Sequence, residues 1–140
     1  MKLISDIMST NVKLTHPHDT LASAAGMMKD HEIGMLPVVE GDRLVGAVTD
    51  RDMAIHGVAE RADPAVVRIS DIMTEGANIC YADQTIDDAR QTMMDHKVRR
   101  VVVLNREDKV AGVLSLGDLA AHATTATSGE ALREITRPGD

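Results

Sequence analysis

The chain has 140 residues, of which 44% are hydrophobic and 26% charged, a composition typical of a folded globular domain. Its 15 basic and 22 acidic residues give a formal net charge of −7, which argues against broad binding to nucleic acid or an anionic membrane, because both require a basic face. A single cysteine excludes an internal disulfide, and no apolar run reaches the roughly 20 residues of a membrane span. We therefore expect a cytoplasmic protein with an aliphatic core, since Tyr81 is its one aromatic residue.

The sequence contains an internal repeat. The pentapeptide Ile-Ser-Asp-Ile-Met at residues 4–8 returns unchanged at residues 69–73, and further identities follow at an offset of 65 and then, after one inserted residue, of 66. Self-similarity of this kind indicates two copies of one supersecondary unit. The matched pairs include Thr20 and Thr85, His31 and His96, Val38 and Val103, Gly46 and Gly112, and Asp52 and Asp118.

The repeat divides the chain into three parts. Residues 57–68 are polar and include Pro64, as expected for a connector between two folded segments. We therefore predict a first domain at residues 1–62, a second at residues 63–123, and a C-terminal tail at residues 124–140, which has no counterpart elsewhere in the chain.

Within each repeat the hydrophobic pattern changes from helical to strand-like in a fixed order. A threonine before apolar residues at helical spacing indicates a capped helix, and the short apolar runs that follow indicate buried strands. The first repeat predicts a strand at 12–15, a helix from Thr20 to about His31, strands at 33–39 and 43–49, and a helix from Asp50. The second repeat predicts a strand at 77–81, a helix from Thr85 to about His96, strands at 98–104 and 109–115, and a helix from Leu116.

Each repeat is thus predicted to be a β-α-β-β-α unit, and the fold class is α/β (α+β). A unit of about 60 residues buries only about 60% of its surface and is marginally stable alone. We therefore expect the two pseudo-symmetric repeats to pack sheet to sheet as one module.

The repeated features resemble a known family. The Ile-Ser-Asp-Ile-Met openings, together with the runs Gly-Ala-Val-Thr-Asp-Arg-Asp at 46–52 and Gly-Val-Leu-Ser-Leu-Gly-Asp at 112–118, are similar to a tandem pair of cystathionine β-synthase (CBS) domains. The resemblance covers roughly residues 3–123 and extends to small stand-alone bacterial CBS-pair proteins, including the hypoxic-response type. It implies two clefts that bind adenosine-containing ligands such as AMP, ADP, ATP, NAD or S-adenosylmethionine.

Two loops carry residue types suited to such a ligand. A ribose offers two adjacent hydroxyls, which a carboxylate accepts well, and Asp52 and Asp118 stand at matching positions one turn into a helix. Thr49 and Ser115 place a hydroxyl and free backbone N–H groups at the helix start, where a phosphate is favoured. Guanidinium groups suit phosphate oxygens, and the candidates are Arg51, Arg99 and Arg100.

The family resemblance implies the remaining contacts. The purine would lie in an apolar slot and meet backbone groups that follow each Met-containing turn. For the first repeat these residues are Thr10, Asn11 and Val12, with slot walls at Leu36 and Pro37. For the second repeat they are Gly76, Ala77 and Asn78, with slot walls at Val101 and Val102. Val102 stands in place of Pro37, and Gly117 in place of a bulkier residue usual in the family, so equal affinity at the two clefts is not expected.

Local structure offers another interpretation of the same residues. The loops 49–52 and 115–118 also fit a helix cap with an acidic third residue. Because side chains alternate along a strand, at most one of Arg99 and Arg100 is expected to point into a given cleft. The six histidines lack a cysteine partner and a His-Glu-x-x-His pattern, so we predict no metal site.

The function expected from these features is regulatory. The sequence has no nucleophile elbow, P-loop or Gly-x-Gly-x-x-Gly motif, so we predict no catalytic activity. The favoured function is a sensor of an adenine nucleotide that signals through its shape or dimer surface to a downstream effector. Two alternatives are a ligand-free structural or interaction protein and a module that binds S-adenosylmethionine. The resemblance implies a homodimer formed through paired helices, and the apolar residues available for it are Ala25, Met28, Ile86 and Met93.

Overall fold

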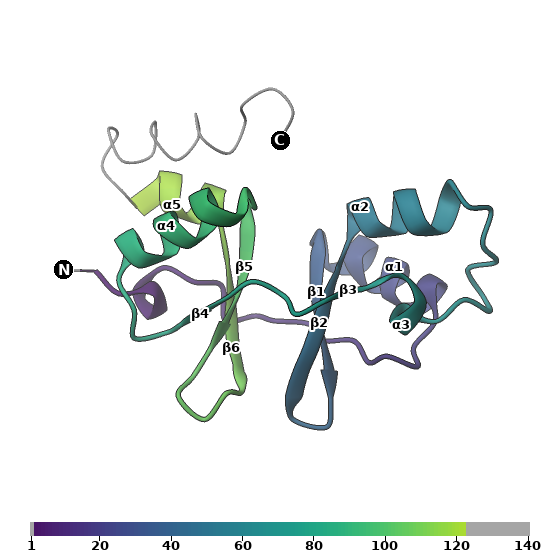
Figure 1. Ribbon diagram of the computed structural model, residues 1–140, viewed down its shortest axis with the longest axis horizontal. Helices are drawn as coiled ribbons and strands as arrows, with labels where there is room; N and C mark the ends of the chain where they lie inside the picture. The colour runs from purple at the N-terminus through teal and green to yellow at the C-terminus, as the bar shows by residue number, and fades with distance from the viewer. Residues whose placement is uncertain (1, 123–140) are drawn as a thin grey trace. The chain divides into compact units, whose positions relative to one another are not determined.

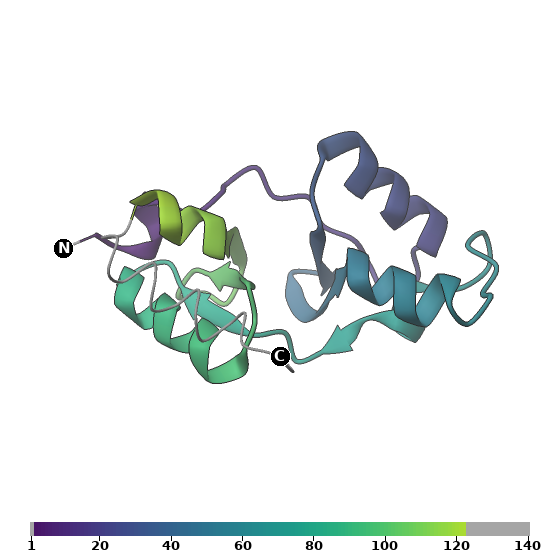
Figure 2. The ribbon, with the colours of Figure 1, turned by 90° about the horizontal axis from the view of Figure 1, so that it is seen from above.

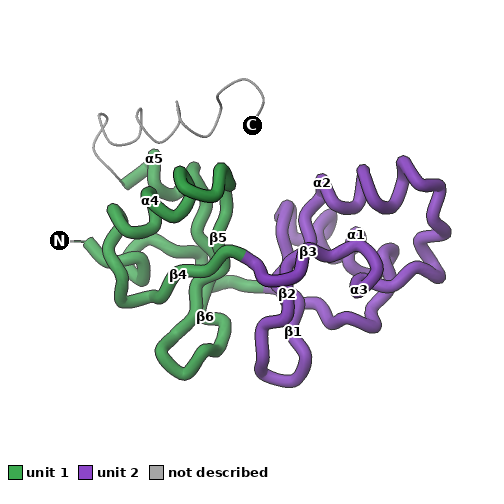
Figure 3. Tube along the Cα trace, in the orientation of Figure 1, with its two compact units in different colours: residues 1–12, 78–140 green, residues 13–77 purple. Residues whose placement is uncertain are grey.

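The described part of the chain, residues 2–122 of a computed structural model, divides into two units (Figure 3). Unit 1 contains residues 2–12 and 78–122, and unit 2 contains residues 13–77. The C-terminal tail predicted at residues 124–140 lies outside the described residues.

Unit 2 combines a three-stranded sheet with helices that gather on one side of its strands (Figures 1 and 2). Its elements are α1 (Leu21–His31), β1 (Met35–Glu40), β2 (Arg43–Thr49), α2 (Asp50–Asp52), the π-helical segment η2 (Met53–Val58), α3 (Ile69–Ile72) and β3 (Thr74–Glu75). The strand order is β1-β2-β3, and both neighbouring pairs are antiparallel.

Unit 1 has a corresponding set of elements. These are the 3₁₀ turn η1 (Ile4–Asp6), β4 (Ile79–Tyr81), α4 (Ile86–His96), β5 (Arg100–Leu104), β6 (Val110–Ser115) and α5 (Leu116–His122). The strand order is β4-β5-β6, in which β4 pairs parallel to β5, and β6 pairs antiparallel to it. The two sheets with their helices confirm the predicted mixed α/β class.

The two long helices begin and end where their sequence signals predict. The Thr20 hydroxyl accepts a hydrogen bond from Ser23 N–H at 3.1 Å, and the Thr85 hydroxyl accepts one from Asp88 N–H at 3.2 Å. Each helix ends at a histidine, and the next residue, Glu32 or Lys97, adopts a left-handed conformation with φ of 53°. A left-handed residue at this position stops the helix.

The strand predicted at residues 12–15 is reduced to one bridge, between Thr15 and Val38. One cause lies on the neighbouring strand, where Pro37 has no N–H to donate. At the equivalent position of unit 1, Val102 N–H donates to Asn78 O at 3.1 Å and the ladder continues as β4. Ala82 N–H also donates to Leu104 O at 2.9 Å, whereas Pro17 at the equivalent position of unit 2 has no N–H, so two prolines account for the difference between the two sheets.

The segments that open the two repeats, residues 4–12 and 69–77, are called the leading segments. They are exchanged between the units. Ile4 and Ile7, from the first repeat, are buried in the core of unit 1 together with residues of the second repeat. Ile69 and Ile72, from the second repeat, are buried in the core of unit 2. The two units therefore differ from the predicted domains at 1–62 and 63–123, because each unit takes its leading segment from the other repeat.

Glycine in the middle of an inner strand permits this exchange. A Cβ atom on Gly46 of β2 would lie 2.6 Å from Thr74 O, and one on Gly112 of β6 would lie 2.7 Å from Ser9 O. Thr74 pairs with Ala47, and Ser9 forms a bridge to Val113. The backbone of each leading segment thus lies in close contact with a glycine of the strand that it pairs with.

The cores are aliphatic, as predicted, and they include two methionines that sequence analysis had assigned to a dimer surface. Met28 is 7% exposed and Met93 is 0% exposed, and both lie in the core of their own unit. Ile86 packs against the unit 1 core, whereas Ala25 is exposed. The excess of apolar residues that supported a dimer is therefore largely used within the units. Within residues 2–122, no helix has the length and apolar character needed to cross a membrane.

Candidate functional site

The predicted ribose-binding aspartates lie in two equivalent loops, one in each unit, with the same capping hydrogen bonds. In unit 2, Thr49 N–H donates to Asp52 Oδ2 at 2.9 Å and Asp52 N–H donates to Thr49 Oγ1 at 3.1 Å. In unit 1, Ser115 N–H donates to Asp118 Oδ2 at 2.9 Å and Asp118 N–H donates to Ser115 Oγ at 3.1 Å. The capping box that local structure predicts is thus present twice.

The cap uses only one oxygen of each carboxylate. Oδ2 of Asp52 and of Asp118 accepts the capping bond, whereas Oδ1 of each has no hydrogen-bond partner among residues 2–122. Both aspartates are half-buried. Capping and ligand binding are therefore compatible, because the cap fixes the carboxylate and leaves one oxygen for a donor from outside.

The leading segments reach the loops in the opposite order to that predicted. Residues 10–12 were expected beside Asp52, but Ser9 pairs with Val113, so Thr10, Asn11 and Val12 belong to unit 1 with Asp118. Residues 76–77 follow β3, which pairs with β2, so Gly76 and Ala77 belong to unit 2 with Asp52. These five positions therefore lie in the other unit than the one expected, because the prediction assumed that each repeat folds on itself, and their role in binding stays a prediction; Asn78 alone lies in the expected unit.

The predicted slot walls divide between two faces of each sheet. Leu36 and Val101 are 0% and 1% exposed and belong to the cores. Pro37 and Val102 are the next residues along β1 and β5, so they point to the opposite face. Pro37 is also buried and Val102 is 1% exposed, so burial does not separate the two pairs, and all four positions stay predictions.

The arginines flank the unit 1 loop directly. Arg100 is the Cα partner of Ser115 across β5 and β6, and Arg99 O accepts a hydrogen bond from Leu116 N–H at 2.8 Å. Both side chains are exposed. The Arg100 side chain lies on the same face of β5 as Val102, because Val101 and Val103 point into the core from the other face. In unit 2, Arg51 is exposed beside Asp52.

Sequence analysis missed the residues that bring the leading segments to the loops, Ser9 and Thr74. A signal for them was present, because glycine within an apolar strand marks a close backbone approach. Gly46 and Gly112 served as repeat positions and as the first residues of the family-like runs, not as contact points. Had they been interpreted as contact points, a neighbouring backbone would have been expected over β2 and β6.

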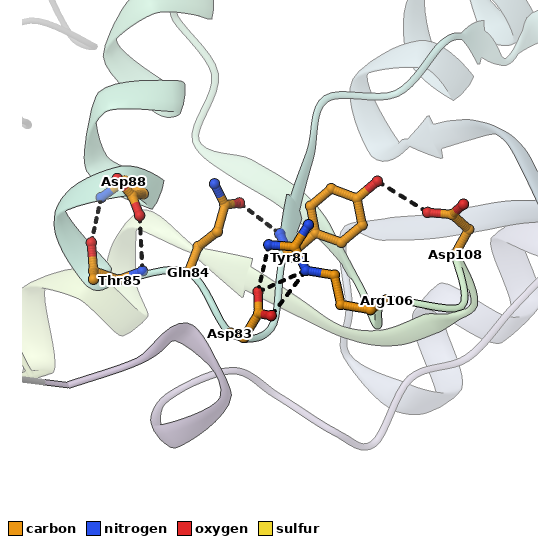
Figure 4. Close-up of polar contacts among 7 residues, drawn as sticks. All are labelled: Tyr81, Asp83, Gln84, Thr85, Asp88, Arg106 and Asp108. Atoms are coloured by element: carbon orange, nitrogen blue, oxygen red, sulfur yellow. Dashed lines mark hydrogen bonds and ion pairs between the residues drawn. The ribbon is translucent and has the colours of Figure 1, made fainter.

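A second polar cluster lies at the far end of β5 from Arg100 (Figure 4). The Arg106 guanidinium lies 4.1 Å from the centre of the Tyr81 ring and binds both oxygens of Asp83, at 2.8 and 2.9 Å. The Tyr81 hydroxyl donates to Asp108 Oδ1 at 3.0 Å. The Arg106 hydrogen bonds lower the pKa of Asp83, and the bond to Asp108 raises the pKa of Tyr81. These contacts hold the turn after β5 against the end of β4.

Comparison with known proteins identifies relatives over nearly the whole chain. The chain is 34% identical over 137 residues to the CBS domain-containing protein YhcV of Bacillus subtilis, covering 97% of this chain and 96% of that protein. It is 35% identical over 123 residues to Hypoxic response protein 1 of Mycobacterium tuberculosis, covering 87% and 85%. The crystal structure of Hypoxic Response Protein I with two coordinated zinc ions matches with a TM-score of 0.78 and 33% identity, over 88% of this chain and 100% of that one.

A ligand-bound relative also shares the fold. The CBS domain pair of protein MJ0100, solved with 5′-methylthioadenosine and S-adenosyl-L-methionine, matches with a TM-score of 0.78 and 25% identity, over 86% of this chain and 94% of that one. Within residues 2–122 of the present chain, no three His, Cys, Asp or Glu side chains gather in a group that could hold a metal ion. The family model of the CBS domain matches residues 4–57 and 69–124. The chain therefore belongs to the CBS domain family and carries two copies of the domain.

Proposed function

We propose that the chain is a regulatory module that binds an adenosine-containing ligand at the two aspartate loops and has no catalytic activity of its own. The observation that carries this proposal is the pair of equivalent loops in which Oδ2 of Asp52 or Asp118 is held by the cap and Oδ1 is left for a ligand. The adenosine ligands bound by the MJ0100 pair support the same class for this chain.

The chemistry of the loop fits a ribose. A carboxylate accepts hydrogen bonds from two adjacent hydroxyls, and a donor to a charged acceptor contributes about 1.5–3 kcal/mol. The capping bond from Thr49 or Ser115 fixes the carboxylate before the ligand arrives, which reduces the entropy cost of binding. Pro37 and Val102 offer apolar contact to the purine, and candidate ligands are AMP, ADP, ATP, NAD and S-adenosylmethionine.

Ligand binding could affect the rest of the chain through the leading segments. Residues 10–12 and 76–77 lie next to the two points, after Val12 and after Ala77, where the chain passes from one unit to the other. A ligand at either site that contacts the adjacent backbone acts at one of these two crossings. Signalling to an effector requires that the ligand bind two conformations with different affinity.

A binding assay with three variants tests the proposal. A ligand that binds only the folded state at 100 times its Kd adds about 2.7 kcal/mol of stability, so a thermal-shift panel with the five candidates identifies it. Asp52→Ala and Asp118→Ala should each weaken binding at one site by about 10- to 150-fold, measured by calorimetric titration. The absence of any shift would instead favour a ligand-free structural or interaction protein.

The matched control is Asp88→Ala on α4. Asp88 forms the same capping box with Thr85, with bonds of 3.0 and 3.2 Å, but belongs to neither loop. Its loss should lower stability by about 0.5–2 kcal/mol, as loss of any cap does, and leave ligand affinity unchanged. Affinity that falls equally in all three variants would assign Asp52 and Asp118 a capping role alone.

Homodimer formation is part of the proposal. Light scattering at micromolar concentration, with and without nucleotide, should give about twice the 15.1 kDa mass of one chain. A mass of one chain under both conditions would exclude the dimer.

A further inference from the structure

The two aspartate loops differ in the residue that faces them from the neighbouring strand. In unit 1, Arg100 is the Cα partner of Ser115, and in unit 2 the equivalent partner of Thr49 is Met35. Met35 is 8% exposed, whereas Arg100 is exposed. Both side chains lie on the face of Pro37 and Val102, opposite the face of Leu36 and Val101, because strand side chains alternate.

Charge differs in the same direction in the segments that precede β1 and β5. Before β5 the chain carries Lys97 and Arg99, where the chain before β1 carries Glu32 and Gly34. The backbones of Arg99 and Gly34 are tied to the loops by equivalent hydrogen bonds, of 2.8 Å from Leu116 N–H and 3.0 Å from Asp50 N–H. The tethered segment beside the unit 1 loop is therefore cationic, and the one beside the unit 2 loop carries one acidic and no basic residue.

The loops themselves carry equal net charge, because Asp50 and Arg51 of unit 2 cancel, and the further contrast comes from the leading segments. Leu116 and Gly117 precede Asp118, whereas Asp50 and Arg51 precede Asp52. The leading segment paired with β2 contributes Glu75, opposite Gly46, where the leading segment in unit 1 has the uncharged Thr10. The residues named for unit 2 thus carry four carboxylates and one guanidinium group, and those named for unit 1 carry two guanidinium groups, one ammonium group and one carboxylate.

We propose that the two sites are specialised by charge: the unit 1 site binds adenosine ligands that carry phosphate, and the unit 2 site binds adenosine ligands that carry none. This inference rests on the proposed function. A phosphate beside Arg100 gains a charge-assisted hydrogen bond, and a guanidinium group can meet two of its oxygens at once. A phosphate beside Asp50, Asp52 and Glu75 meets like charges, which disfavour it, whereas a neutral or cationic adenosine compound does not.

The experiment measures how strongly a phosphate group changes affinity at each site. Asp52→Ala weakens the unit 2 site and leaves the unit 1 site intact, whereas Asp118→Ala does the reverse. Each variant is titrated calorimetrically with adenosine, AMP and ATP. We expect Asp52→Ala protein to bind AMP at least about tenfold tighter than adenosine, since a hydrogen bond to a charged group contributes that much. We expect Asp118→Ala protein to bind adenosine at least as tightly as AMP.

A second substitution identifies the responsible side chain. Arg100→Met, which installs the residue found at the equivalent position of unit 2, should remove the AMP preference in the Asp52→Ala background. Arg106→Met is the matched control, because it makes the same change of charge in unit 1 at the other end of β5. The preference should survive Arg106→Met, and it should decline between low and high salt, because ions screen exposed charges.

The outcomes separate this inference from the function on which it rests. An equal or reversed phosphate preference at the two sites, or a preference that survives Arg100→Met, would overturn the specialisation while leaving adenosine binding intact. Failure of the parent protein to bind adenosine, AMP or ATP would overturn the proposed function and the specialisation together.

Discussion

Replacing Gly46 by alanine tests the close contact between β2 and the exchanged leading segment. The new Cβ would lie 2.6 Å from Thr74 O and 3.3 Å from Met73 Sδ. A carbon atom essentially never approaches an oxygen within 3.0 Å, so β3 must move by at least about 0.4 Å, the difference between 3.0 and 2.6 Å. Overpacking of this kind costs about 1–3 kcal/mol. Alanine recovers about 0.4–1 kcal/mol by restricting the unfolded chain.

The net loss of stability from Gly46→Ala should therefore be about 1–2 kcal/mol. In urea, where the unfolding free energy of a small protein falls by about 1–3 kcal/mol per molar, this lowers the unfolding midpoint by about 1 M. Circular dichroism at 222 nm is the appropriate assay, because the chain lacks tryptophan. Gly112→Ala should behave in the same way, since its Cβ would lie 2.7 Å from Ser9 O.

Gly26→Ala is the control. Gly26 lies within α1, and a Cβ there would meet nothing within 4 Å. Alanine is the better helix former, so this variant should gain about 0.5–1 kcal/mol. A midpoint for Gly46→Ala at or above that of the parent, measured beside a stabilised Gly26→Ala, would refute the contact between β2 and β3.

Three ionisable groups give further predictions. The hydrogen bond to Asp108 raises the pKa of Tyr81. An absorbance titration reports on this tyrosine alone, and its midpoint should lie above 10 in the parent and at a lower pH in Asp108→Asn. Equal midpoints in the two proteins would contradict the hydrogen bond. Burial acts to raise the pKa of Asp19, but hydrogen bonds from His16 N–H and the Thr15 hydroxyl lower it overall. Asp19 therefore stabilises the fold above the unfolded-state pKa near 4, and this contribution disappears as the pH falls through the lower folded value. Urea midpoints from pH 7 to 3 should fall less in Asp19→Asn than in the parent, and parallel curves would exclude the effect. Burial raises the pKa of Cys80, so the native thiol should react with Ellman's reagent far more slowly than in urea, and similar rates would show that it is accessible.

The elements that the sequence predicts well are those whose signals are local. Thr20 and Thr85 cap their helices through residues three positions away, and the positions that end the helices lie within the same turn. The capping loops at Asp52 and Asp118 belong to the same class, since every partner lies within three residues. Hydrogen bonds of such short range can be inferred from spacing alone.

The features that could not be predicted depend on partners distant in the sequence. The pentapeptides at 4–8 and 69–73 are identical, so their sequence cannot specify which of two similar surfaces each one covers. The strand at 12–15 is shortened in part by Pro37, which lies on another strand. An apolar run likewise does not reveal which of its residues, such as Leu36 and Val101, face the core until the register is known.

The exchange of leading segments has a consequence for the order in which the protein is completed during synthesis. Unit 2 is one continuous stretch, residues 13–77, and all of its parts are available once Ala77 has left the ribosome. Unit 1 must wait until β6 and α5 have emerged, and until then Ile4 and Ile7 on the nascent chain have no core to enter. During that interval the same segment can enter the unit 1 core of another copy, which is how a domain-swapped dimer forms.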